Sequence, residues 1–117
     1  MRTVQASEIT KNIREMCIEA NHFLSDDMKK VFNESVEKEE SPLGKQILNQ
    51  LKENLEIAGR DMIPICQDTG MACVFVELGQ DVHIEGDFEQ AIHEGVRRGY
   101  GEGYLRKSIV GDPLRRV

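Results

Sequence analysis

Residues 64–70 of the chain read Pro-Ile-Cys-Gln-Asp-Thr-Gly, and the predicted fold is arranged on either side of them. A long helical pattern ends just before this stretch, and an apolar run, residues 72–76, begins just after it. Polar side chains gathered in a loop between two regular elements are typical of binding and catalytic sites. We therefore expect helices before the stretch, strands after it, and candidate functional groups within it.

Three amphipathic helices are predicted before this loop. Apolar residues recur there at steps of three and four, which marks the buried face of a helix. These apolar stripes occupy residues 6–24, 28–36 and 43–58. Serines are the predicted N-caps and a glycine is the predicted C-terminal stop of the third helix, namely Ser7, Ser25, Ser41 and Gly59.

Two strands and a fourth helix are predicted after the loop. Residues 72–78 are apolar and β-branched, and residues 81–85 alternate with period two, as a half-buried partner strand does. Asp87 followed by Gln90 resembles a capping box and begins a helix, which the glycines of residues 95–103 close. The expected fold class is therefore α+β, with N-terminal helices followed by a small antiparallel β hairpin or sheet and a further helix.

Composition excludes several function classes. A chain of 117 residues has room for one core, and thus for one domain or part of one. The net charge of −6 and the aromatic content of 5% argue against a nucleic-acid surface. No apolar run reaches membrane-spanning length, and the N-terminus lacks a signal-peptide core. The three cysteines suggest no disulfide framework, so we expect a cytoplasmic protein.

The loop is compatible with more than one kind of chemistry. Asp68-Thr69-Gly70 is the triplet of aspartic proteases, in which two close carboxylates share a proton. Those enzymes place the aspartate at the end of an apolar strand in an almost all-β protein, whereas here it follows three helices. An iron–sulfur cluster with one open iron could take a thiolate from Cys66, but one cysteine cannot hold a cluster alone.

A zinc site is the third possibility. Structural zinc sites draw on cysteines two to four residues apart, and Cys66 and Cys73 are too widely spaced for such a pair. Cys73 lies in the apolar run and Cys17 on the apolar face of the first helix, where both are expected to serve in packing. The histidines that could join such a site are more simply surface or core-edge residues, and they are His22, His83 and His93.

The loop and two downstream segments together resemble one known family. The downstream segments are Gly-Tyr-Leu-Arg-Lys-Ser at residues 103–108 and Asp-Pro-Leu-Arg-Arg at residues 112–116. With the loop, they make the chain similar to the class I iron–sulfur fumarate hydratases, including the related L-tartrate dehydratase α subunits. The resemblance covers essentially the whole chain and implies a hydro-lyase that interconverts fumarate and L-malate in the tricarboxylic acid cycle, or acts on tartrate.

The resemblance also implies roles for four residues. Cys66 matches the first of three cysteines that hold a [4Fe–4S] cluster whose fourth iron binds substrate. Gln67 and Asp68 match residues at the substrate, with Asp68 the catalytic acid–base group. Arg106 matches an arginine that binds a carboxylate of the dicarboxylate substrate, a role that suits the planar fork of a guanidinium.

The resemblance implies a larger protein as well. The other two cluster cysteines and the proposed catalytic base match nothing in residues 1–117, which are expected to be the N-terminal part of an α-type catalytic domain. The implied partner is a β subunit, or a C-terminal domain of the same enzyme, within an oligomer such as a dimer. Alone, this segment is expected to be inactive, and a purely structural or assembly role for it is the alternative of a different class.

Overall fold

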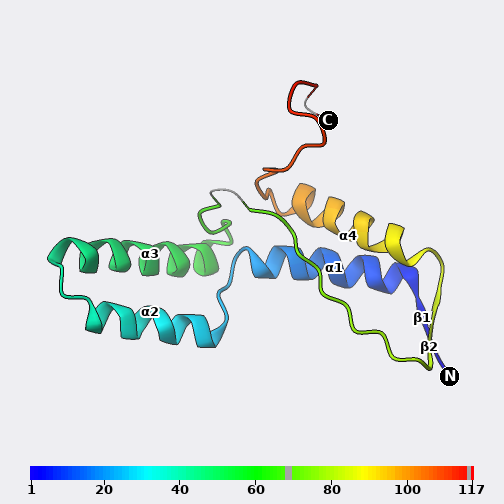
Figure 1. The fold of residues 1–117 in the computed structure, drawn as a ribbon, viewed down its shortest axis with the longest axis horizontal. Coiled ribbons are helices and arrows are strands. Elements are labelled where there is room, and N and C mark those ends of the chain that lie inside the picture. Colours follow the sequence, from blue (N-terminus) through cyan, green and yellow to red (C-terminus); the bar gives the residue numbers. More distant parts are fainter. Residues whose placement is uncertain (68–69, 116) are drawn as a thin grey trace. The chain divides into compact units, whose positions relative to one another are not determined.

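The computed structural model describes residues 1–67, 70–115 and 117 (Figure 1). Its helices and strands are β1 (Arg2–Gln5), α1 (Ala6–Ala20), α2 (Asp26–Lys38), α3 (Pro42–Asp61), β2 (Val82–Glu85) and α4 (Phe88–Glu102). The chain divides into two compact units, residues 1–18 with 67–117 and residues 19–66. The predicted α+β class is confirmed. Within the described parts of the chain, no helix has both the length and the apolar character to cross a bilayer.

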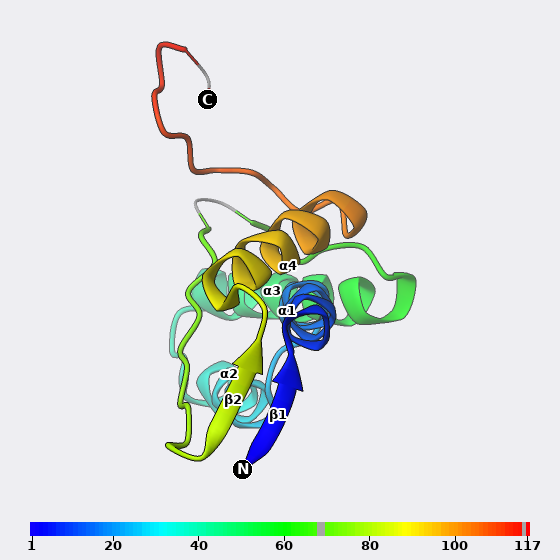
Figure 2. The same cartoon turned by 90° about the vertical axis from the view of Figure 1, so that its right-hand side faces the viewer.

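The two strands pair in parallel, so the expected antiparallel hairpin is wrong. β1 and β2 run side by side in the same direction, with Arg2 opposite Val82 and Gln5 opposite Glu85 (Figure 2). β2 falls within the predicted strand 81–85, but its partner is an N-terminal strand that the sequence pattern did not reveal. Parallel strands need a long connection between them, and residues 6–81 supply it.

Residues 72–78 form no strand in the structure, contrary to prediction. The side chains along this segment are exposed, and that of Phe75 is 94% exposed. Cys73 is exposed too, so its predicted packing role is wrong. β-Branched residues favour a strand where a neighbouring strand satisfies their N–H and C=O groups. The sheet that the described residues form contains β1 and β2 alone, so the segment has no such neighbour.

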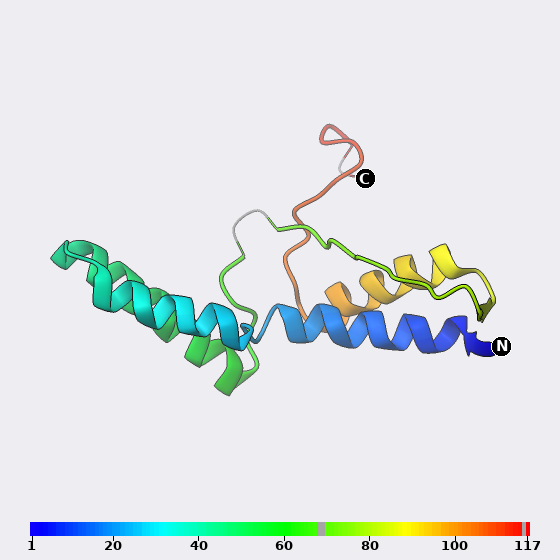
Figure 3. The ribbon, with the colours of Figure 1, turned by 60° about the horizontal axis from the view of Figure 1, so that its bottom comes forward.

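Helices α1 and α4 pack closely in the first unit (Figure 3). Thr10 Oγ1 donates a 2.9 Å hydrogen bond to the carbonyl of Ala91. A Cβ atom on Gly95 would lie 2.6 Å from the Cβ of Ile13, closer than non-bonded carbons approach. Cys17 is half-buried in this contact, and a Cβ on Gly99 would lie 2.8 Å from the Cβ of Cys17. Gly95 and Gly99 were expected to close α4 but lie inside it, since the helix continues to Glu102, and they allow it to lie against α1.

The second unit consists mainly of α2 and α3. Two predicted N-caps are confirmed, since Ser25 and Ser41 precede these helices and the Ser41 hydroxyl accepts a 3.2 Å hydrogen bond from the N–H of Gly44. Gly59 does not stop α3, which continues to Asp61. A Cβ on Gly59 would lie 3.2 Å from the ring of Phe23, so this glycine serves close packing instead.

Two boundaries of the first helix also differ from prediction. α1 begins at Ala6, directly after β1, so Ser7 lies inside the helix rather than at its N-cap. The helix ends at Ala20 instead of Leu24, because the chain turns there with the N–H groups of His22 and Phe23 bonded to the carbonyl of Glu19. At the start of α4, the Asp87 side chain accepts a 3.0 Å hydrogen bond from the N–H of Gln90, which confirms Asp87 as the N-cap of that helix.

Candidate functional site

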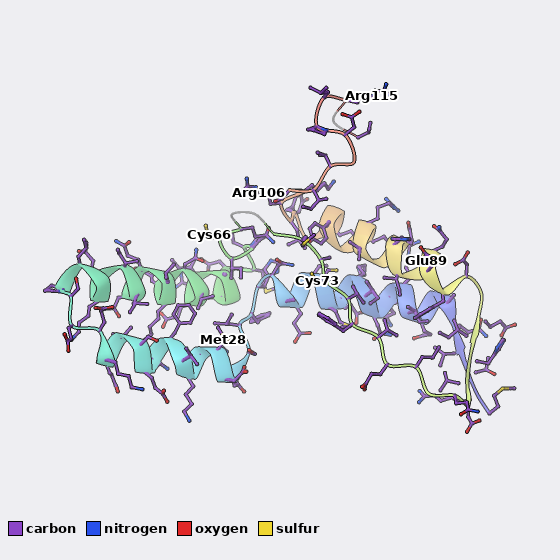
Figure 4. The ribbon with its side chains drawn as sticks, in the orientation of Figure 1. Met28, Cys66, Cys73, Glu89, Arg106 and Arg115 are labelled. Carbon is purple, nitrogen blue, oxygen red and sulfur yellow. The ribbon has the colours of Figure 1, made fainter. Side chains whose placement is uncertain are left out.

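Cys66 lies in the segment that follows α3, and its side chain is exposed (Figure 4). The backbone N–H of Cys66 donates a 3.2 Å hydrogen bond to Oδ1 of Asn54 on α3. The N–H of the preceding Ile65 donates a 2.8 Å hydrogen bond to the carbonyl of Asn21. These two bonds anchor the backbone of Ile65 and Cys66 to two other segments of the second unit, and the Cys66 side chain is exposed.

Gln67 and Arg106 are joined by two hydrogen bonds, although they lie 39 positions apart in the sequence. The backbone N–H of Arg106 donates to Gln67 Oε1 at 2.8 Å, and Arg106 Nη1 donates to the Gln67 carbonyl oxygen at 2.7 Å. The structure therefore brings these two predicted site residues together. Asp68, the predicted acid–base residue, lies outside the described residues.

The end of α4 determines where Arg106 lies. The helix ends at Glu102, and the N–H of Leu105 donates a 3.1 Å hydrogen bond to the carbonyl of Tyr100. This is the bond of a Schellman turn, whose left-handed position is occupied here by Tyr104 with a φ of 54°. Leu105 is then buried, at 5% exposure, while Arg106 is exposed. The buried Leu105, directly before Arg106, thus anchors the backbone that carries the guanidinium.

A pocket of about 310 Å³ adjoins this segment within the first unit. Its walls come from α4, from residues 70–72 after the central loop, and from residues 107–109 after Arg106. Most of the lining is apolar, with Met71, Val96 and Ile109 among the contributors. Ser108 also lines it, and the Ser108 Oγ is buried without a hydrogen-bond partner among the described residues.

The Cys17 thiol and the Tyr100 phenol both have a raised pKa. Burial raises the pKa of the Cys17 thiol. Burial and then the neighbouring thiols of Cys17 and Cys73 raise the pKa of the Tyr100 phenol. Because the thiolate is the form that binds a metal, a raised pKa makes Cys17 a poor ligand, in agreement with its packing role.

The described residues do not form a cluster site by themselves. A [4Fe–4S] cluster held by three cysteines needs three converging thiolates. No group of three His, Cys, Asp or Glu side chains in the described part of the chain is arranged to hold a metal ion. The residues of the discarded zinc interpretation are dispersed, with His22 buried at 3% exposure and His83 and His93 exposed on β2 and α4. Exposed Cys66 fits as one cluster ligand, but a cluster held by three cysteines needs two more.

Comparison with known proteins supplies the family. A sequence profile described as fumarate hydratase (fumerase) matches residues 10–117. The chain belongs to this family. Its relatives in the fumarate hydratase family include a Methanocaldococcus jannaschii protein named as L(+)-tartrate dehydratase subunit alpha, which is 33% identical over 111 residues. That alignment covers 93% of this chain and 39% of the relative.

Two fumarate hydratases show the same relationship over shorter alignments. The anaerobic class I fumarate hydratase of Escherichia coli is 39% identical over 70 residues, which are 60% of this chain and 13% of that enzyme. The mitochondrial fumarate hydratase 1 of Leishmania major is 32% identical over 82 residues, which are 70% of this chain and 14% of that enzyme. The chain thus spans well under half the length of these relatives. The resemblance to class I fumarate hydratases and tartrate dehydratase α subunits is confirmed.

Sequence reasoning missed two features of this fumarate-hydratase-family site. The first is the pair of hydrogen bonds between Gln67 and Arg106, which no local pattern encodes because the residues are far apart in the chain. The second is the buried hydroxyl of Ser108. Its signal was present, since the serine belongs to the segment that carried the family resemblance, but no role was assigned to it.

Proposed function

We propose that this chain is the N-terminal part of the α-type catalytic domain of an iron–sulfur hydro-lyase that interconverts fumarate and L-malate. The observation that carries the proposal is the Gln67–Arg106 connection in a chain of the fumarate hydratase family, because it fixes an exposed guanidinium on Gln67, the residue that follows Cys66 in the sequence. Exposed and held at its backbone, Arg106 is suited to bind one carboxylate of a four-carbon dicarboxylate.

The loop residues take complementary roles in this proposal. Gln67 is at the substrate and also fixes the direction of Arg106, since its Oε1 accepts the Arg106 backbone N–H. Asp68 acts in acid–base chemistry at the substrate. Gln67 is hydrogen-bonded to Arg106, so a ligand held at Arg106 lies next to Gln67.

Cys66 is proposed as one thiolate ligand of the [4Fe–4S] cluster, and the other ligands come from parts of the enzyme that these 117 residues do not include. In the assembled enzyme the cluster supplies a Lewis-acidic iron for the substrate hydroxyl. The exposure of Cys66 and the two hydrogen bonds that anchor its backbone support this role. A cytoplasmic location follows from the need to keep such thiolates reduced.

L-Tartrate is the second candidate substrate, with oxaloacetate as the product. It is favoured by the relative named as a tartrate dehydratase subunit alpha, to which 93% of this chain aligns. That name also supports a separate β subunit as partner, in place of a C-terminal domain of the same polypeptide. Both reactions remove water from a hydroxylated four-carbon dicarboxylate, so the same Arg106 contact serves either substrate.

The test is an anaerobic assay of the full-length enzyme, with its partner subunit where one exists, on fumarate, L-malate and L-tartrate. Arg106→Ala is expected to lower kcat/KM at least 100-fold, because a charge-assisted bidentate contact with a carboxylate is lost. Arg98→Ala is the matched control, since Arg98 is an arginine on the surface of α4 that pairs with Glu94. Wild-type kinetics in the Arg106→Ala enzyme would refute the carboxylate contact.

Cys66→Ala tests the cluster separately. The purified variant is expected to lose its bound iron and its activity together, measured by metal analysis and by the cluster's visible absorption. Cys73→Ala serves as the control, because Cys73 is equally exposed and is not proposed as a ligand. Full iron content and full activity in Cys66→Ala would remove Cys66 from the ligand set.

A further inference from the structure

The hydroxyl of Ser108 is buried and has no hydrogen-bond partner among the described residues. A buried hydroxyl without a partner destabilises the fold, so folded proteins rarely keep one without a reason. Ser108 lines the 310 Å³ pocket within the first unit. A buried polar atom that costs stability, in a residue that lines a cavity, is a candidate contact for a ligand.

The remaining lining shows what kind of ligand would fit. Met71, Val96 and Ile109 contribute apolar surface that suits hydrocarbon. Lys107 lines the same pocket, and its positive charge favours an anion. A hydroxyl donates one hydrogen bond, for which a carboxylate oxygen is a strong acceptor. The pocket therefore matches a small carboxylate with a short hydrocarbon chain.

The position of the pocket connects it with the proposed function. One wall is residues 70–72, which follow the central loop, and another is residues 107–109, which follow Arg106. Ser108 is thus two positions beyond the arginine that is proposed to bind the first carboxylate. A four-carbon dicarboxylate has a second carboxylate at its other end, and Arg106 accounts for only one of the two.

We propose that Ser108 is a further substrate-binding residue, whose hydroxyl donates a hydrogen bond to an oxygen of the dicarboxylate while the apolar walls contact its carbon chain. This proposal rests on the proposed function, because it assigns the pocket to the same substrate. It explains why the free protein keeps an unsatisfied hydroxyl in a largely apolar pocket. The hydrogen bond is completed when the ligand binds.

The test compares Ser108→Ala with Ser108→Thr in the full-length enzyme under anaerobic conditions. Ser108→Ala is expected to raise KM for L-malate, fumarate or L-tartrate about tenfold, because a hydrogen bond to a charged group is lost. Ser108→Thr keeps the hydroxyl and is expected to stay within about threefold of wild type. Ser7→Ala, an exposed serine on α1, is the matched control and is expected to leave KM unchanged.

Thermal unfolding without ligand separates a substrate contact from a structural role. Removing an unsatisfied buried hydroxyl, as Ser108→Ala does, should leave the Tm of the ligand-free enzyme unchanged or slightly higher. A lower Tm with an unchanged KM would show that another protein group binds the hydroxyl, and the proposal would be wrong. If neither KM nor Tm changes, the hydroxyl interacts with solvent alone, and the proposal is wrong in that case too.

The same experiment distinguishes this proposal from the proposed function. If the wild-type enzyme converts a dicarboxylate in an Arg106-dependent manner but Ser108→Ala behaves as wild type, the Ser108 contact alone is refuted. If the wild-type enzyme converts none of the three substrates, the proposed function fails and the Ser108 contact fails with it.

Discussion

Gly95 of α4 offers a sharp test of how closely α4 lies against α1. A Cβ added there would lie 2.6 Å from Ile13 Cβ and 2.8 Å from both Ile13 Cγ2 and the carbonyl oxygen of Thr10. Non-bonded carbon atoms are stable at about 3.5–4.0 Å, so about 1 Å of separation is missing at this position. Two of the three opposing atoms belong to the branch point of a side chain and to backbone, which cannot rotate away.

The expected cost of Gly95→Ala follows from this geometry. Forcing an extra methyl group into a packed contact costs about 1–3 kcal/mol. Alanine is favoured over glycine inside a helix by about 0.5–1 kcal/mol, which offsets part of that cost. We expect a net loss of about 1–2 kcal/mol in the free energy of unfolding, measured by urea titration with circular dichroism.

Gly101 provides the matched control within the same helix. A Cβ on Gly101 would meet no atom within 4 Å, so Gly101→Ala should gain the helix preference without a clash. It is therefore expected to stabilise the protein by about 0.5–1 kcal/mol. If Gly95→Ala proves as stable as Gly101→Ala, the close packing of α4 on α1 is wrong.

Two further predictions concern α4 and the turn that follows it. Tyr104 has a φ of 54°, a left-handed conformation that strains any residue with a Cβ. Tyr104→Gly should therefore raise the free energy of unfolding, measured by urea titration, by about 1 kcal/mol, whereas Tyr104→Ala should not, because alanine keeps a Cβ. Equal effects of the two substitutions would refute backbone strain at this position. Arg97 and then Arg98 hold the pKa of the Glu94 carboxyl down to about 2, below the roughly 4.3 of an unfolded glutamate. The stabilisation is therefore complete above pH ~5 and is lost as pH falls towards 2, and the stability difference between wild type and Glu94→Gln should shrink across that window. A difference that stays constant with pH would show that the ion pairs do not contribute.

The helices and most of their N-caps, though not that of α1, were predictable because they depend on neighbouring residues. The spacing of apolar residues defines a helical face, and Ser41 or Asp87 binds an N–H three positions ahead. The ends were less predictable. Gly59 looked like a stop signal, but its contact with Phe23 shows that a glycine can be selected for close packing as well as for a turn.

The strands illustrate the opposite case. Residues 72–78 have high β-propensity and form no strand, while Arg2–Gln5 has one buried-facing apolar residue and does form one. A strand exists when another strand satisfies its backbone, and that partner is 80 residues away for β1. No window of neighbouring residues contains this information.

The family, the α+β class and the choice of candidate site residues could be inferred from the sequence alone, because they depend on local patterns and on a short motif around Cys66. The parallel pairing of β1 with β2, the hydrogen bonds between Gln67 and Arg106, and the burial of the Ser108 hydroxyl became visible only in the folded chain. All three depend on segments far apart in the sequence, and such contacts form only when folding brings those segments together.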